Sequence, residues 1–105
     1  MEQAVFIYCT VPDKDTATVI GRKLVENRLA ACVSFGAPVQ SIYRWQDVIE
    51  EATEFTITIK TVQENYSKIE ELVLSLHPYE IPEIVMVKMD NGLKPYLEWV
   101  VSETR

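Results

Sequence analysis

The sequence predicts an α+β fold of the ferredoxin-like type, the split βαβ arrangement in which both main helices lie on one face of an antiparallel sheet. The first observation behind this prediction is the element order β-α-β-β-α-β, followed by one more helix. The second is size, because 105 residues with 48% hydrophobic and 25% charged side chains suit a single domain spanning 1–105. The third is the scarcity of breaks: three glycines and five prolines, with no linker or repeat.

The first unit consists of a strand and a helix. Residues 4–10 form a β-branched and aromatic run, which predicts a strand buried on both faces. Residues 12–16 supply turn and helix-capping chemistry, and apolar side chains then recur at helical spacing over 17–24. Gly21 lies in this helix, where the lack of a side chain permits a close approach to the sheet.

The next segment predicts a long hairpin. Residues 31–35 restart the strand pattern and 39–45 continue it, so we expect one long strand that a bulge interrupts near Gly36 and Pro38. Gln46-Asp47 is a plausible turn, and the residues from Phe55 to Lys60 alternate between apolar and polar. The two strands on either side of the turn should therefore pair.

The last third of the chain predicts a helix, a strand and a short terminal helix. Apolar side chains between residues 66 and 76 return to helical spacing, and the helix should end at His77-Pro78, because the residue before a proline is pushed out of the α region. Residues 83–89 then form a strand. A final helix covers 93–101, with Pro95 near its start.

The hairpin is too long for the rest of the predicted sheet. From Cys32 to Trp45 it would reach about 45 Å if fully extended, whereas strand 4–10 would reach about 23 Å. An exposed apolar edge invites aggregation unless another chain pairs with it, so we expect a closed homo-oligomer. The alternative is a hairpin that folds back on its own body. The apolar residues at its far end are Ile42, Tyr43, Trp45, Val48 and Ile49.

Charge and hydropathy exclude several partners. Ten basic against sixteen acidic residues give a formal charge of −6, which is poorly suited to holding a phosphate backbone, so nucleic acid is not expected. No apolar run approaches the roughly 18 residues of a membrane span. The N-terminus has no secretory signal pattern, so we expect a cytoplasmic protein in which Cys9 and Cys32 are free thiols.

Five motifs together carry a family signature. They are LAACV at 29–33, SIYRW at 41–45, IKT at 59–61, HPYEIPE at 77–83 and YLEW at 96–99. In this order they resemble the CutA family of divalent-cation tolerance proteins, over nearly the whole chain. The resemblance implies a ferredoxin-like protomer in a tight homotrimer akin to PII signalling proteins. It also implies a link to divalent metal tolerance, above all to copper, without an established catalytic activity.

Cys9 and His77 are the candidate metal ligands. Cys9 ends the first strand, and His77 lies just before the strand expected to run antiparallel beside it, so their ends should meet. Thiolate and imidazole suit copper or zinc, and soft sulfur favours Cu(I), so copper or another divalent metal ion is the expected cofactor. The alternative is structural, with a buried thiol and a histidine that caps backbone groups.

The resemblance also exposes a departure at the neighbouring position. The resemblance implies that copper-binding family members use a cysteine at the Cys9 position and two successive histidines. This chain has the second histidine, His77, and carries Leu76 in place of the first. A missing ligand could come from Glu80, Met86 or a neighbouring subunit, or be absent. Cys32 matches another family cysteine, and its place at the start of a core strand favours packing over metal binding.

A second group of residues suggests a ligand cleft between subunits. It mixes aromatic and ionisable side chains from the family motifs: Tyr43, Trp45, Lys60, His77, Tyr79, Glu80 and Trp99. Aromatic residues at an oligomer interface are also ordinary packing, so both interpretations stay open. The acidic residues Asp47, Glu50, Glu51 and Glu54, near the hairpin tip, are expected to form a solvated edge rather than a cation site.

Catalysis is not expected. The chain has no glycine-rich phosphate loop, no HExxH or CxxC motif, and a single histidine to serve as a general base. An acylphosphatase-like activity would need an anion-cradling loop after the first strand, but that loop carries Asp13. Two functions therefore remain: a trimer that binds divalent metal, and a PII-like module whose clefts sense a small molecule or dock a partner protein.

Overall fold

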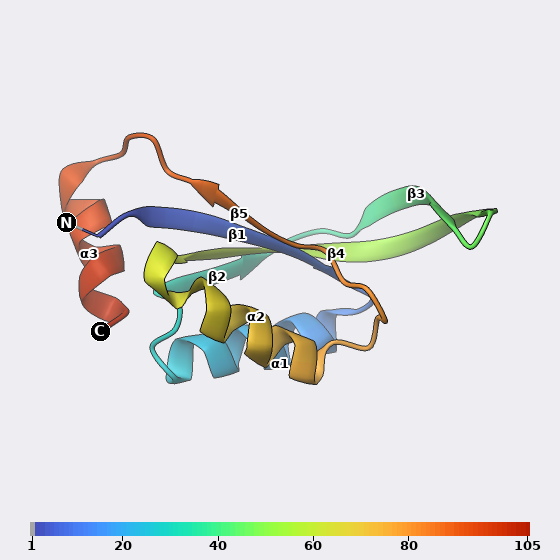
Figure 1. Ribbon diagram of the computed structural model, residues 1–105, viewed down its shortest axis with the longest axis horizontal. Helices are drawn as coiled ribbons and strands as arrows, with labels where there is room; N and C mark the ends of the chain where they lie inside the picture. The colour runs from blue at the N-terminus through green and yellow to red at the C-terminus, as the bar shows by residue number, and fades with distance from the viewer. Residues whose placement is uncertain (1) are drawn as a thin grey trace.

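In a computed structural model, which describes residues 2–105, the elements follow the predicted order (Figure 1). The first half of the chain forms β1 (Ala4–Val11), α1 (Lys14–Glu26), β2 (Cys32–Phe35), β3 (Val39–Trp45) and β4 (Val48–Val62). The second half forms a 3₁₀ turn (Gln63–Asn65), α2 (Tyr66–Leu76), β5 (Ile84–Lys88) and α3 (Lys94–Glu103).

The sheet has the ferredoxin-like strand order. Its neighbours run β2-β4-β1-β5, every pairing is antiparallel, and β3 pairs with the outer part of β4. The central strands β1 and β4 are paired from Ala4 opposite Val62 to Val11 opposite Phe55. The fold class predicted from the sequence is therefore confirmed, with α1 and α2 on the same side of the sheet (Figure 1).

The hydrophobic core lies between α1, α2 and one face of the sheet. Alternate β1 residues from Val5 to Val11 are fully buried there, against side chains such as Leu24 of α1 and Ile69 of α2. The residues between them, Phe6 and Tyr8, point to the opposite face and keep partial exposure. The prediction that this strand is buried on both faces is thus wrong for one chain, because α1 and α2 cover only one side.

Local chemistry explains both ends of α1. The Asp13 carboxylate accepts a hydrogen bond from the backbone N–H of Thr16 at 2.7 Å, which caps the first turn. The helix closes before Arg28, whose positive φ of 58° turns the chain toward β2. In between, a Cβ added to Gly21 would lie 3.2 Å from Cγ1 of Val33, so the close helix–sheet approach expected at this glycine is confirmed.

The hairpin differs in detail from the single interrupted strand predicted. The chain forms two separate strands, β2 and β3, and both pair with different parts of the fifteen-residue β4. The turn at Gln46-Asp47 is confirmed, with positive φ values of 50° and 66° at these two residues. The β3–β4 arm extends beyond the helices and gives the molecule a long axis of 45 Å against 25 and 24 Å (Figure 1).

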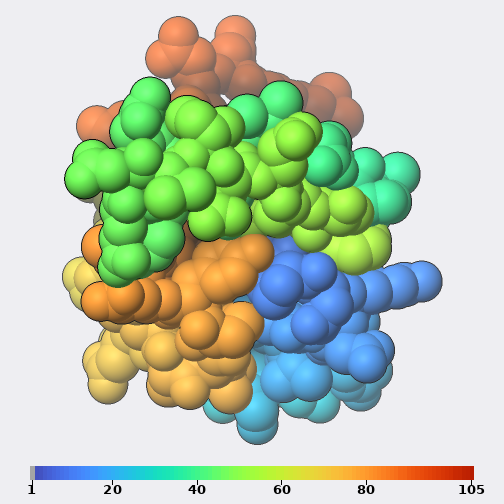
Figure 2. All heavy atoms as spheres, turned by 90° about the vertical axis from the view of Figure 1, so that its right-hand side faces the viewer, coloured from blue at the N-terminus to red at the C-terminus, as the bar shows by residue number. Residues whose placement is uncertain are grey.

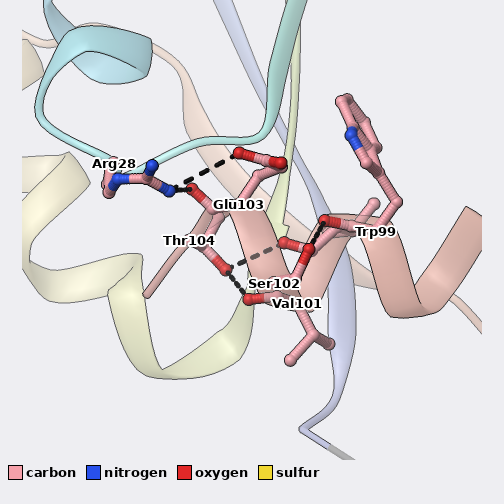
Figure 3. A network of polar contacts seen from close by, with 7 residues as sticks. Arg28, Trp99, Val101, Ser102, Glu103 and Thr104 are labelled. Atoms are coloured by element: carbon pink, nitrogen blue, oxygen red, sulfur yellow. Dashed lines mark hydrogen bonds and ion pairs between the residues drawn. The ribbon is translucent and has the colours of Figure 1, made fainter.

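The terminal helix α3 packs against β1 and β4 at the opposite end from the hairpin tip (Figure 1). Val100 and Val101 are buried there. The last turn is held by Arg28, whose guanidinium donates to the Glu103 carbonyl at 3.2 Å, and by the Thr104 hydroxyl, which donates to two carbonyls of the same turn (Figure 3). Among residues 2–105, no helix has the length and apolar character to cross a bilayer.

Candidate functional site

Cys9 and His77 converge on one backbone carbonyl, that of Thr10. The Cys9 thiol donates to this oxygen at 3.7 Å, and Nε2 of His77 lies 2.7 Å from it. The antiparallel pairing of β1 with β5 places the end of one strand beside the start of the other, with Cys9 opposite Ile84. The topology therefore brings together the two residues that the sequence analysis paired.

Both ring nitrogens of His77 are engaged by the backbone. Nδ1 accepts a hydrogen bond from the N–H of Tyr79 at 3.1 Å, so it carries no proton. The neutral ring therefore has its proton on Nε2, which donates to the Thr10 carbonyl. A metal ion can use His77 only by replacing one of these two hydrogen bonds.

Cys9 is fully buried and is held in its protonated form. Burial, together with the nearby negative charges of Glu83 and Glu54, raises the pKa of the Cys9 thiol to about 12. A thiol must lose its proton to ligate a metal. Metal binding at Cys9 would therefore release a proton at neutral pH.

Within residues 2–105, the structure forms no cluster of three His, Cys, Asp or Glu side chains arranged to hold a metal ion. Leu76, at the position of the absent histidine, packs against the core, as does Met86 of β5. Glu80 is exposed. One chain therefore supplies two candidate ligands, and the sequence alternatives Glu80 and Met86 do not complete a site with them.

Cys32 does not pack in the core as predicted. The register of β2 places it opposite Lys60 of β4, on the sheet face away from α1 and α2, where it is half-buried. Its sulfur lies 3.7 Å from the Lys60 ammonium nitrogen, which also donates to the Ser34 hydroxyl. Shifting the pairing of a strand by one residue moves each side chain to the other face of the sheet, and composition alone could not fix the pairing of β2.

A cleft of about 350 Å³ lies where the hairpin meets the C-terminal end of β1 and the α2–β5 loop. Figure 2 shows this end of the molecule, with the hairpin (green) above the loop after α2 (orange) and the end of β1 (blue). We call it the aromatic cleft because Tyr43, Trp45 and Tyr79 line it. Its other lining residues are Thr10, Ser41, Glu54, Ile81 and Glu83.

The two acidic lining residues, Glu54 and Glu83, are not among the site residues predicted from the sequence. Glu54 had been predicted to form a solvated edge, but it is only 7% exposed, and its carboxylate accepts a hydrogen bond from the Tyr79 hydroxyl at 2.7 Å. That bond crosses from β4 to the α2–β5 loop, a contact that no local pattern reveals. The other three acidic residues of the group, Asp47, Glu50 and Glu51, are exposed as expected.

Three residues predicted for the cleft lie elsewhere in the chain. Lys60 contacts Cys32 and Ser34 on the open sheet face, and Glu80 points into solvent. Trp99 lies on α3 beside Tyr96, with ring centroids 5.9 Å apart, at the far end of the molecule from the hairpin tip (Figures 1 and 3). A single chain thus unites Tyr43, Trp45 and Tyr79 in the cleft. It places His77 beside Tyr79 but outside the lining, with ring centroids 4.8 Å apart, and it separates the other three residues of the predicted set.

The sheet order and the long hairpin arm define a ferredoxin-like α+β protein with an extended β-hairpin. The model of one family, described as CutA1 divalent ion tolerance protein, matches residues 5–103. The chain belongs to this family.

Sequence relatives include the divalent-cation tolerance protein CutA of Thermus thermophilus, which is 42% identical over 99% of both chains. Human protein CutA is 40% identical over 96% of this chain and 55% of its own length. The chain therefore spans nearly all of the bacterial relative and about half of the human one.

Solved structures of the family superpose closely. CutA from Xylella fastidiosa gives a TM-score of 0.94 at 38% identity, covering 97% of this chain and 98% of the other. A structure from Archaeoglobus fulgidus, named as a periplasmic divalent cation tolerance protein CutA, gives 0.94 at 35% identity, covering 97% and 99%.

Proposed function

We propose that this chain serves divalent-cation tolerance as a homotrimer that binds copper, or another divalent metal ion, weakly through Cys9 and His77. The observation that carries the proposal is the convergence of a thiol and an imidazole on the Thr10 carbonyl. Sulfur and imidazole nitrogen are the ligand types that copper prefers, and sulfur favours its reduced form. The names of the relatives in Thermus thermophilus and Archaeoglobus fulgidus point to the same physiological role.

Weak binding follows from the state of the two ligands. The metal must displace a proton from a buried thiol whose pKa is about 12, and it must break one backbone hydrogen bond of His77. Both steps make the affinity for the metal lower than that of a free thiolate and a free imidazole held in the same positions. A reduced thiol is required throughout, and a reducing cytoplasm, the location expected from the sequence, would keep it so.

The trimer is supported by apolar surface that one chain leaves uncovered. Val85 and Val87 of β5 are 45% and 48% exposed on the sheet face opposite α1 and α2, next to the partly exposed Phe6 and Tyr8. The hairpin arm exposes further apolar side chains of its own, among them Ile42 at 68% exposure. A cyclic assembly would bury the open sheet face and the arm together.

Anaerobic titration with Cu(I), in competition with a chromogenic chelator, tests the metal site. We expect Cys9→Ser and His77→Ala each to lower the Cu(I) affinity by at least tenfold, because each removes one of two ligands. Cys32→Ser is the matched control, since its sulfur lies on the other sheet face beside Lys60, and it should leave the affinity unchanged. Unchanged binding in both ligand variants would reject this site, and loss in Cys32→Ser alone would move it.

A further inference from the structure

The aromatic cleft lies beside the Cys9–His77 pair and supports an inference beyond the metal function proposed above. We propose that this cleft binds a small primary ammonium ion, the protonated form of an organic amine, between Glu54 and the rings of Trp45 and Tyr79. The argument rests on an unneutralised buried carboxylate, a second acid on the same wall and the aromatic lining.

Glu54 is the central group. It lines the cleft, yet the residue is only 7% exposed to solvent. The Tyr79 hydroxyl donates to one of its oxygens at 2.7 Å, and no lysine or arginine among residues 2–105 forms an ion pair with it. A buried carboxylate is costly without a positive partner, so a cation in the cleft would supply the missing charge.

Glu83 makes the cleft still more favourable to a cation. Its carboxylate lines the same cavity and accepts a hydrogen bond from the Thr10 hydroxyl at 3.3 Å. The two carboxylates stand on the walls of one cleft, so together they give it a negative potential. An anionic or phosphorylated ligand would be repelled from this position.

The aromatic lining selects an organic cation over a hydrated metal ion. Tyr43, Trp45 and Tyr79 line the cleft, and aromatic rings attract an ammonium group and would pack against its alkyl chain. A divalent metal needs several oxygen, nitrogen or sulfur ligands, and the described residues form no cluster of three His, Cys, Asp or Glu side chains that could hold one. A primary ammonium ion is favoured over a quaternary one, because its N–H groups can donate to the carboxylate oxygens.

The size of the cleft fits a small ligand. A volume of about 350 Å³ lies at the lower end of the range for small-molecule sites. Three separate segments form its walls: the hairpin, the end of β1 and the α2–β5 loop. The ligand would therefore join the arm to the body of the molecule.

Tryptophan fluorescence tests the proposal directly, because Trp45 lines the cleft. The chain has two tryptophans, so a Trp99→Phe background leaves Trp45 as the reporter. Titration of the assembled protein with n-butylammonium chloride at constant ionic strength should give a saturable change in emission. The neutral isostere n-butanol and the anion butyrate should give a response at least tenfold weaker.

Matched variants assign the effect to the carboxylates. Glu54→Gln should weaken n-butylammonium binding at least tenfold, and Glu83→Gln, at an exposed position where folding is not at risk, should weaken it severalfold. Glu51→Gln removes an exposed acid of the same strand outside the cleft and should change nothing. Cys9→Ser should also leave this binding intact, which separates the amine site from the copper site.

Three results would overturn the proposal. Equal binding of n-butanol would make the cleft a neutral apolar site, and unchanged affinity in both Glu54→Gln and Glu83→Gln would remove the role of charge. Absence of saturation together with a lower sedimentation mass of Glu54→Gln would instead assign the cleft to a basic side chain of a neighbouring copy. None of these results would affect the Cu(I) titration of Cys9 and His77.

Discussion

His77 combines two roles that compete with each other. Its imidazole ties the Thr10 carbonyl to the Tyr79 N–H, so it joins the end of β1 to the loop before β5. The same ring is the nitrogen ligand of the proposed metal site. Metal binding therefore costs a local structural contact, and the exchange should loosen the loop that carries Tyr79.

The protonated state of Cys9 predicts how copper binding depends on pH. The pKa of the thiol is raised to about 12, so the free protein keeps this proton throughout the neutral range and each bound Cu(I) must release it. The apparent affinity should therefore rise about tenfold per pH unit between about pH 7 and about pH 9. Chelator competition at several pH values measures the slope.

The same measurement on two variants completes this pH prediction. Cys32→Ser should retain the slope, whereas any residual binding in Cys9→Ser should lose it. A flat profile in the unmodified protein would mean that Cys9 is not a ligand.

At the scale of single elements, α1 depends on its capping residue. The Asp13 carboxylate accepts a hydrogen bond from the Thr16 N–H. Hydrogen bonding to the backbone and side chain of Thr16 lowers the pKa of this carboxyl below the ordinary 3.8. Asp13→Ala should lower the Tm by roughly 5 °C at neutral pH, because it leaves a first-turn N–H without a partner. Thermal unfolding followed by circular dichroism measures the change.

The sign of the pH effect at Asp13 follows from the direction of the shift. A carboxyl whose pKa is lowered by folding stabilises the protein fully above its unfolded value of 3.8, and the benefit is lost as the pH falls through the lowered folded value. The difference in Tm between the unmodified protein and Asp13→Ala should therefore shrink below that pH. Asp15→Ala, in the same first turn but without a capping bond, is the control and should show a smaller effect at neutral pH.

Most element positions could be predicted because local chemistry sets them. The helix α2 ends at Leu76 because Pro78 follows His77, and the backbone of His77 is extended as that rule requires. The convergence of Cys9 and His77 was also predictable, since the strand order alone brings β1 beside β5. These features need no knowledge of side-chain packing.

The aromatic cleft was only partly predictable, because strand register and loop path decide its composition. Glu54 lies within a run of acidic residues typical of a solvated edge, and only the path of the α2–β5 loop buries it beneath Tyr79. Trp99 belongs to another of the family motifs, and α3 carries it to the opposite end of the molecule from the hairpin tip (Figure 1). Membership in a family motif therefore did not reveal which residues lie together in the folded chain.

For the whole molecule, assembly can be tested at the open sheet face. Val87→Asp should reduce the sedimentation mass of the protein from about three times 12.1 kDa toward 12.1 kDa, because a charge without a partner in an interface costs several kcal/mol. Val19→Asp is a matched control, since Val19 is 46% exposed on α1 and Val87 is 48% exposed on β5. The control should leave the mass unchanged.

Sedimentation equilibrium at micromolar protein distinguishes the outcomes for the assembly. A mass of 12.1 kDa for the unmodified chain would reject the trimer outright. Equal masses for the unmodified chain and Val87→Asp would place the interface away from the open sheet face, and the hairpin arm would then be the next surface to test.

The length of β4 gives the molecule a mechanical property. This strand is unbroken from Val48 to Val62, so the ladder that holds the hairpin tip continues into the central sheet between β1 and β2. A displacement of the tip is therefore passed along a continuous strand, with no loop in β4 to absorb it. Glu54 pairs with Val39 where the arm joins the central sheet, so a displacement of the tip would also move a wall of the aromatic cleft.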